Sequence, residues 1–129
     1  MRPVSLTWPG GHNAFRLRLG ELRALQQARD AGPEEIFNRL RAGRWHPDDV
    51  IQVIRWGLVG GGEKDAGAAA AMVTPLIDLH PLAEFKLTAL AILGHALFGP
   101  GDDTLGEDAG AAETPPENGS SPSSMAAAP

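Results

Sequence analysis

Apolar and polar residues alternate at two places near the start of the chain, over residues 4–8 and again over residues 15–19. A period of two puts alternate side chains on one face of a strand. Residues 9–13, between the two segments, combine Pro9 with two glycines and Asn13, which are typical turn residues. The pattern therefore predicts an N-terminal β-hairpin.

Beyond residue 20 the apolar positions follow the period of a helix. A first helix is predicted over about residues 20–30, with Gly32 as its left-handed terminator. Pro33 suits a first helical turn and predicts a second short helix that ends before Gly43. The apolar positions of the first helix are Leu19, Leu22, Leu25 and Ala28.

A third helix has the best-defined start. Pro47 precedes Asp48 and Asp49, and Trp45 is placed to pack on Val50 as a hydrophobic staple, which predicts a helix to about residue 59. On a helical wheel of 100° per residue, this helix has a broad apolar face that is expected to face the core, and a second set of residues on the opposite side. The core face carries Val50, Ile51, Val53, Ile54 and Leu58, and the back carries Gln52, Trp56 and Val59.

Two further helices are predicted. The first is alanine-rich and runs from Ala66 towards Pro75, where a kink or restart is expected. The second follows His80 and Pro81 and ends near residue 98, with His95 on a polar face beside Glu84 and Thr88. Its apolar face, expected to close the core, carries Leu82, Phe85, Ala89, Ile92, Leu93, Ala96 and Leu97. The predicted class is α+β, mostly α: one hairpin and four to five short helices in a domain of residues 1–98.

Residues 99–129 differ sharply from this domain in composition. They hold six acidic residues, no Lys or Arg, and mostly Gly, Ala, Ser and Pro, which predicts a disordered acidic tail. The domain keeps all 11 basic residues of the chain against the other ten acidic ones. Because nucleic-acid binding draws most of its affinity from a basic surplus, this balance predicts no nucleic-acid partner.

The chain has no cysteine, which excludes disulfides and thiol catalysis. The N-terminus lacks the apolar run of a signal peptide, and no stretch approaches the roughly 20 apolar residues of a membrane span. These features predict a cytoplasmic protein with no membrane partner.

No pattern for catalysis, metal or cofactor binding stands out. Lys64 follows the glycines at 60–62 one residue too late for a phosphate-binding loop, so these glycines are interpreted as a helix stop. The four histidines lack metal-ligand spacing, and Asp48 with Asp49 suits the dipole of a helix start. Ser5 is the only serine of the domain and lacks the sequence context of a nucleophile. We therefore predict a binding protein, not an enzyme, with no cofactor.

A helix-turn-helix is the one DNA-binding alternative. The second and third predicted helices could form it across Gly43 and Trp45. The would-be recognition helix, however, begins with two aspartates and offers Arg55 as its sole base, so a DNA-binding regulator is disfavoured.

Three motifs taken together resemble a known family, over about residues 4–98. The hairpin leads into Leu17-Arg18-Leu19-Gly20-Glu21-Leu22, and Asp48-Asp49-Val50 and Gly57-Leu58-Val59-Gly60-Gly61-Gly62 follow in order. This pattern resembles the small tail-assembly proteins of gene transfer agents, which look like the tail-assembly chaperones of long-tailed phages.

The resemblance implies that the protein binds the tape-measure protein and recruits tail-tube subunits in the producing bacterial cell. A structural tail-tube component is the alternative that it leaves open, and a homo-oligomer is possible under either role. An apolar surface is expected to hold the partner. Trp56, with Val59 and Gln52 beside it on the back of the third helix, is the predicted protein-binding site.

Overall fold

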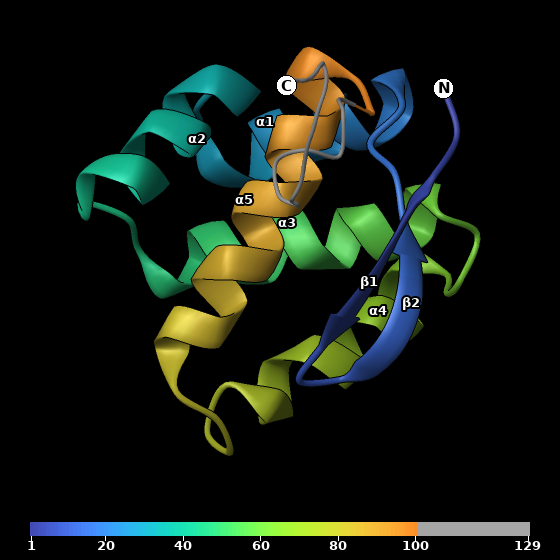
Figure 1. Ribbon diagram of the computed structural model, residues 1–129, viewed down its shortest axis with the longest axis vertical. Coiled ribbons are helices and arrows are strands. Elements are labelled where there is room, and N and C mark those ends of the chain that lie inside the picture. The colour runs from blue at the N-terminus through green and yellow to red at the C-terminus, as the bar shows by residue number, and fades with distance from the viewer. Residues whose placement is uncertain (101–129) are drawn as a thin grey trace, which may run out of the picture. The chain divides into compact units, whose positions relative to one another are not determined.

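The computed structural model describes residues 1–100 (Figure 1). A two-stranded antiparallel hairpin comes first and five helices follow, so the predicted α+β, mostly helical class is confirmed. The acidic tail predicted for residues 99–129 lies, from residue 101 onward, outside the described residues. The elements are β1 Val4–Trp8, β2 Gly11–Phe15, α1 Leu19–Arg29, α2 Pro33–Ala42, α3 Pro47–Gly60, α4 Ala66–Leu76 and α5 Leu82–Phe98.

The hairpin differs from its prediction in the second strand, which is Gly11–Phe15 and not residues 15–19. The reason is a tight turn: Pro9 and Gly10 alone connect the strands, and Trp8 pairs with Gly11. Gly11, His12 and Asn13, which the sequence pattern assigns to the turn, therefore belong to β2, and Pro9 and Gly10 remain the turn. Trp8 Nε1 donates to Asn13 Oδ1 at 2.7 Å, and the Trp8 and Phe15 rings meet edge to face, which stabilises the hairpin on its inner side.

Helix ends follow the predicted chemistry, with one exception. Gly43 ends α2 with a φ of 76°, and Pro47 begins α3, as expected from the sequence. The exception is the end of α1, where Asp30 takes the left-handed conformation with a φ of 52°. Gly32, predicted to fill that role, is extended and precedes Pro33 at the start of α2. The chain changes direction two residues earlier than predicted because Asp tolerates this conformation better than most residues do.

The core lies around α3, which packs against α1, α4 and β2. Val50, Val53, Ile54 and Leu58 are fully buried, which confirms most of the predicted core face of this helix. Ile51 is only half-buried, at the edge of that face. From α5, Phe85, Ala89, Ile92 and Leu93 complete the core, whereas Leu82, predicted to join them, is 42% exposed.

The carboxyl end of α3 lies directly against the hairpin. The Arg16 amide donates to the Gly57 carbonyl at 3.0 Å, and Arg16 Nε donates to the Gly60 carbonyl at 3.0 Å. A Cβ at Gly60 would overlap the Arg16 carbonyl, and one at Gly61 would overlap the Ala14 carbonyl. These glycines are therefore needed for a close approach of helix and strand backbones, in addition to ending the helix.

Residues Met1–Leu97 form one compact unit. No helix within residues 1–100 combines the length and apolar character that crossing a membrane requires.

Candidate protein-binding groove

Residues of β1 and α5 line an open groove between these two elements. Figure 1 shows the ribbons of β1 and α5 in front of α3. The groove has a volume of about 460 Å³ and is mostly apolar. Its lining residues, which define the β1–α5 groove, are Leu6, Thr7, Trp8, Pro9, His80, Glu84, Leu87, Thr88 and Ala91. A concave, apolar surface with a few polar groups is the usual form of a binding site.

One face of α5 is turned towards β1. On a helix of 100° per residue, Glu84, Leu87, Thr88, Ala91 and His95 fall within about 100° of one another. The sequence predicts that Thr88 and His95 belong to a polar, solvated face, but both side chains are buried. Thr88 lines the groove opposite β1, and His95 bonds Arg2 just before β1, so the surroundings of both depend on the start of the chain, which the pattern of α5 alone does not reveal.

His95 attaches the start of the chain to α5. Its Nε2 lies 2.7 Å from the carbonyl oxygen of Arg2, and since a carbonyl only accepts, this nitrogen donates the hydrogen bond. The contact joins the residues just before β1 to the last turns of α5. It holds the two walls of the β1–α5 groove in place at one end.

An exposed leucine of α5 contributes to the apolar wall of the groove. Leu87 lines the groove and is 67% exposed. Leu79, just before α5, is 72% exposed and Leu82 in its first turn is 42% exposed, but neither of them lines the groove. A large exposed apolar side chain in the wall of a groove is typical of a surface that another chain covers.

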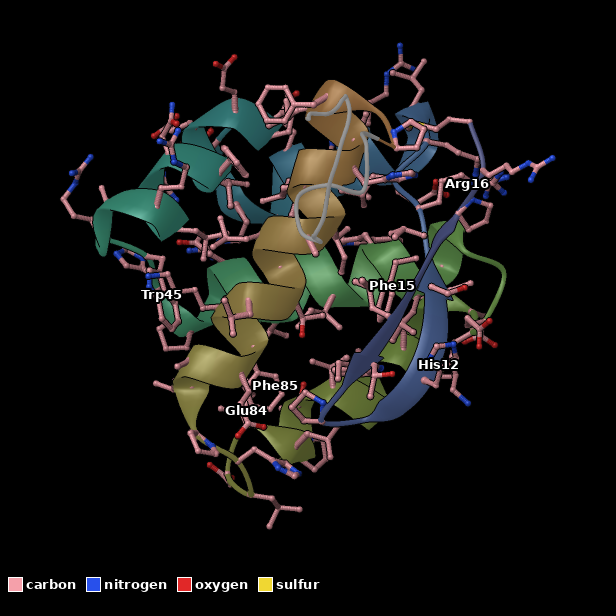
Figure 2. All side chains as sticks on the ribbon, in the orientation of Figure 1. His12, Phe15, Arg16, Trp45, Glu84 and Phe85 are labelled. Atoms are coloured by element: carbon pink, nitrogen blue, oxygen red, sulfur yellow. The ribbon has the colours of Figure 1, made fainter. Side chains whose placement is uncertain are left out.

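Glu84 is the main charged group of the groove. Its carboxylate is 4.0 Å from His80 Nδ1, and both side chains are partly exposed. Figure 2 shows Glu84 near the start of α5, and His12 and Arg16 on the side of the hairpin away from α5. The Thr88 hydroxyl donates to the Glu84 carbonyl at 3.0 Å, so the polar atom of Thr88 is already satisfied. The groove therefore offers a negative charge beside an apolar wall.

The backbone edge of β1 is open along this groove. Residues of an antiparallel pair alternate between those that bond the partner strand and those that point away from it. Since the two-residue turn makes Trp8 and Gly11 a bonded pair, the backbone groups of Ser5 and Thr7 point away from β2. They make no hydrogen bond within the described residues.

The opposite edge of the sheet is covered. Gly60 and Gly61, at the end of α3, lie against the backbone of Ala14 and Arg16. The motif of residues 57–62, noted in the sequence for its family resemblance, therefore has a structural role in closing the β2 edge. Only the β1 edge of the described sheet is left for another chain.

Asp49 forms a separate buried cluster at the start of α3. Its carboxylate accepts hydrogen bonds from the His46 amide at 2.8 Å, from Arg29 Nε at 2.8 Å and from Arg39 at 3.1 Å. Burial by itself raises the pKa of Asp49, but the His46 amide and the two guanidinium groups together hold that pKa below its usual value. This cluster joins α1, α2 and α3, and its carboxylate is fully occupied, so its role is structural.

Glu21 plays a similar part at the start of α1. It accepts from the Arg18 amide at 2.9 Å and from the Arg18 guanidinium at 3.0 Å. Burial raises the pKa of Glu21, but these bonds from Arg18 outweigh burial and leave the pKa lowered. The Leu-Gly-Glu-Leu segment of the family resemblance thus contains a side chain that caps its own helix.

The predicted protein-binding residues Gln52, Trp56 and Val59 share one side of α3, as the wheel indicates. All three are half-buried, and Trp56 and Val59 pack against the core. Trp56 Nε1 donates to Gln52 Oε1 at 3.1 Å, and the Arg55 guanidinium lies 4.7 Å from the Trp56 ring centre. Trp56 is therefore less exposed than predicted, and its binding role stays a prediction.

Sequence reasoning missed the β1–α5 groove. One signal was present: Leu87 lies apart from the core stripe of α5 that Phe85 and Ile92 mark, and it is 67% exposed. A leucine outside a core stripe indicates a second apolar surface. The position of the hairpin beside it could not be read from the sequence.

A hairpin and five helices with one open groove beside β1 define a small α+β protein, and comparison with known families identifies it further. The chain belongs to the family described as phage tail tube protein, GTA-gp10, whose model matches residues 3–99. It is therefore a tail-related protein of the gene transfer agent type. No curated protein and no solved structure matched the chain.

Proposed function

We propose that the protein is a component of the tail tube, which joins the tail by binding another tail protein in the β1–α5 groove. The family match over residues 3–99 is the observation that carries this proposal, because the family is described as a phage tail tube protein. The groove supplies the physical means, with exposed Leu87 in its wall and the unpaired edge of β1 beside it.

A tail-assembly chaperone is the second candidate, and the size of the groove favours it. A volume of about 460 Å³ suits a short segment of a partner and thus a small contact. Permanent complexes commonly bury more than about 2,000 Å² in total, and small interfaces are typical of transient ones. A chaperone that binds the tape-measure protein or tail-tube subunits in the cytoplasm of the producing cell needs such reversible binding.

The packing of α3 disfavours a DNA-binding regulator. Most of α3, the would-be recognition helix, faces the core, and Arg55 is its sole basic residue. Arg55 Nε donates to the Ala66 carbonyl at 3.0 Å, which ties this side chain to α4. We therefore expect no salt-sensitive DNA binding.

Composition of purified particles separates the two candidates. A tube component should be present in them at a fixed ratio to the other tail proteins, measured by quantitative mass spectrometry. A chaperone should be absent from finished particles and should co-purify from producing cells with the tape-measure protein. Absence from both preparations contradicts both candidates.

A further inference from the structure

We infer that the β1–α5 groove takes an extended segment of a partner protein, which adds to β1 as a third strand and places a Lys or Arg beside Glu84. This inference rests on the proposed function, because it assigns the chemistry of the partner to the same groove. The bound segment is a strand with apolar residues at alternate positions and one basic residue at the end nearest Glu84.

The unpaired edge of β1 specifies a strand in preference to a helix. The backbone groups of Ser5 and Thr7 point away from β2 and have no partner within residues 1–100. An added strand pairs with such groups through its own backbone, which a helix cannot do because its backbone bonds are internal. Main-chain pairing therefore provides the register of the bound segment.

The wall opposite β1 specifies alternate apolar residues. Leu87 and Ala91 are exposed and one turn apart on α5, and both line the groove with Leu6. A strand beside β1 directs every second side chain towards α5, where these residues lie. Apolar side chains on this face of the added strand would pack on Leu87. Polar side chains there would bury their polar atoms against Leu87 without a hydrogen-bond partner.

Charge complementarity specifies the basic residue. Glu84 lines the groove together with Trp8 and Pro9, and its carboxylate lies 4.0 Å from His80 Nδ1. Within residues 1–100 no Lys or Arg forms an ion pair with Glu84, since the arginine ion pairs there are with Glu21, Glu35 and Asp49. A Lys or Arg of the partner beside Glu84 supplies the missing opposite charge.

The added strand must lie on the β1 side because the other edge of the hairpin is closed. The β2 edge is closed by Gly60 and Gly61 against Arg16 and Ala14. Glu84 disfavours an acidic strand on the β1 side. The occupant is therefore selected by both backbone pairing and charge.

The test uses the full chain and a fluorescent peptide, Lys-Thr-Val-Thr-Val-Thr-Val, with binding followed by anisotropy. Two control peptides keep most of the composition: one begins with Glu in place of Lys, and one has the same residues with the alternation broken as Lys-Val-Val-Val-Thr-Thr-Thr. We expect the first peptide to bind about five-fold more tightly than the Glu peptide, as a partly exposed ion pair allows. Equal binding of all three peptides overturns the inference.

Three variants locate the site. Thr7→Pro removes an edge N–H and Leu87→Glu places a charge in the apolar wall, and each is expected to weaken binding about ten-fold. Glu84→Lys should reverse the preference, so that the Glu peptide binds more tightly than the Lys peptide. Two matched controls should bind as the unmodified chain does. Leu19→Glu places the same charge at a leucine that is 60% exposed on α1, and Thr7→Val keeps the backbone donor of residue 7.

Other occupants give different outcomes, and each overturns the inference. If sedimentation shows a dimer that Leu87→Glu abolishes, the occupant is a second copy of the chain. If a synthetic peptide of residues 119–129 displaces the probe more effectively than unlabelled probe does, the occupant is the chain's own C-terminal segment. Because the particle measurement above is independent of peptide binding, failure of this inference is distinguishable from failure of the proposed function.

Discussion

Arg29 Nε donates to the Asp49 carboxylate at 2.8 Å, joining the last turn of α1 to the first turn of α3. Asp49 is completely buried, whereas the Arg29 side chain is 16% exposed. Arg39 of α2 reaches the same carboxylate oxygen at 3.1 Å. One acidic residue therefore holds three helices together, and adjacent Asp48, which is exposed, takes no part in this contact.

The first prediction compares these two aspartates. Asp49→Ala leaves two guanidinium groups and the His46 amide without their acceptor, and we expect it to lower the free energy of unfolding by about 3 to 5 kcal/mol. Asp48→Ala should lower it by less than about 1 kcal/mol, the value of a charge at a helix start. Urea unfolding followed by circular dichroism measures both. Equal losses for the two variants would show that the buried cluster contributes no specific stability.

The second prediction is a loss of stability in acid. The pKa of Asp49 is lowered in the folded chain below the 3.8 that is ordinary for an aspartate, so its stabilising effect is complete above that ordinary value. As pH falls below it, the unfolded chain takes up a proton first, and the stabilisation disappears once pH passes through the lower pKa of the folded state. Thermal midpoints between pH 6 and pH 2 should therefore fall less steeply for Asp49→Asn than for the unmodified chain. Parallel curves for the two proteins contradict this prediction.

The third prediction concerns the close approach at the end of α3. A Cβ at Gly60 would overlap the Arg16 carbonyl and come within 2.8 Å of Glu21 Oε1, so Gly60→Ala should lower the free energy of unfolding by about 3 kcal/mol. Gly20→Ala, at a helical glycine with open space around it, should be neutral or stabilising by up to about 1 kcal/mol. Chemical denaturation of the pair checks the result, and a neutral Gly60→Ala would show that the two backbones can separate freely.

The fourth prediction tests the core. Ile54→Ala and Leu93→Ala each remove a fully buried side chain, and each should lower the free energy of unfolding by about 2 to 5 kcal/mol. Glu84→Gln, on the exposed side of α5, should change it by no more than about 0.5 kcal/mol. Calorimetry of the three variants decides whether α3 and α5 share one core. A silent Ile54→Ala means that its face of α3 is assigned incorrectly.

The fifth prediction concerns Trp56. Because its ring is half-buried against the core and its Nε1 bonds Gln52, we expect Trp56→Ala to lower the free energy of unfolding by about 2 kcal/mol. Binding of the folded fraction to a tail partner should be unchanged in a pull-down. The reverse outcome, a change in stability below about 1 kcal/mol with a binding loss of ten-fold or more, supports the interaction surface that the sequence predicts at Gln52, Trp56 and Val59.

Helix positions could be predicted from the sequence because their signals are local. Pro33 and Pro47 mark helix starts, and Gly43 marks an end, through backbone preferences that act within a turn. The second strand was predicted wrongly because Gly11 and His12 are poor strand formers, and only pairing with β1 makes them part of β2. Tertiary contact overrides local preference there.

The candidate site was less predictable than the fold. His95 and Thr88 appear polar and solvated from the pattern of α5, and their surroundings depend on the start of the chain, more than 70 residues earlier. The groove likewise arises where β1 and α5 meet, so no single segment carries its signature. Trp56 was predicted to bind a partner because a helical wheel places it opposite the core face of α3. A wheel represents one helix alone and takes no account of α4, which packs on α3.

The close contact of Gly60 with Arg16 has a consequence for stoichiometry. A sheet with two open edges can accept a strand on each side and can thus nucleate a chain of molecules joined edge to edge. Here the end of α3 occupies the β2 edge, so in the strand addition that we infer each molecule pairs with one segment at the β1 edge and offers no second open edge within residues 1–100. Such a molecule can hold an aggregation-prone strand of a partner as a one-to-one complex without becoming part of a growing fibre.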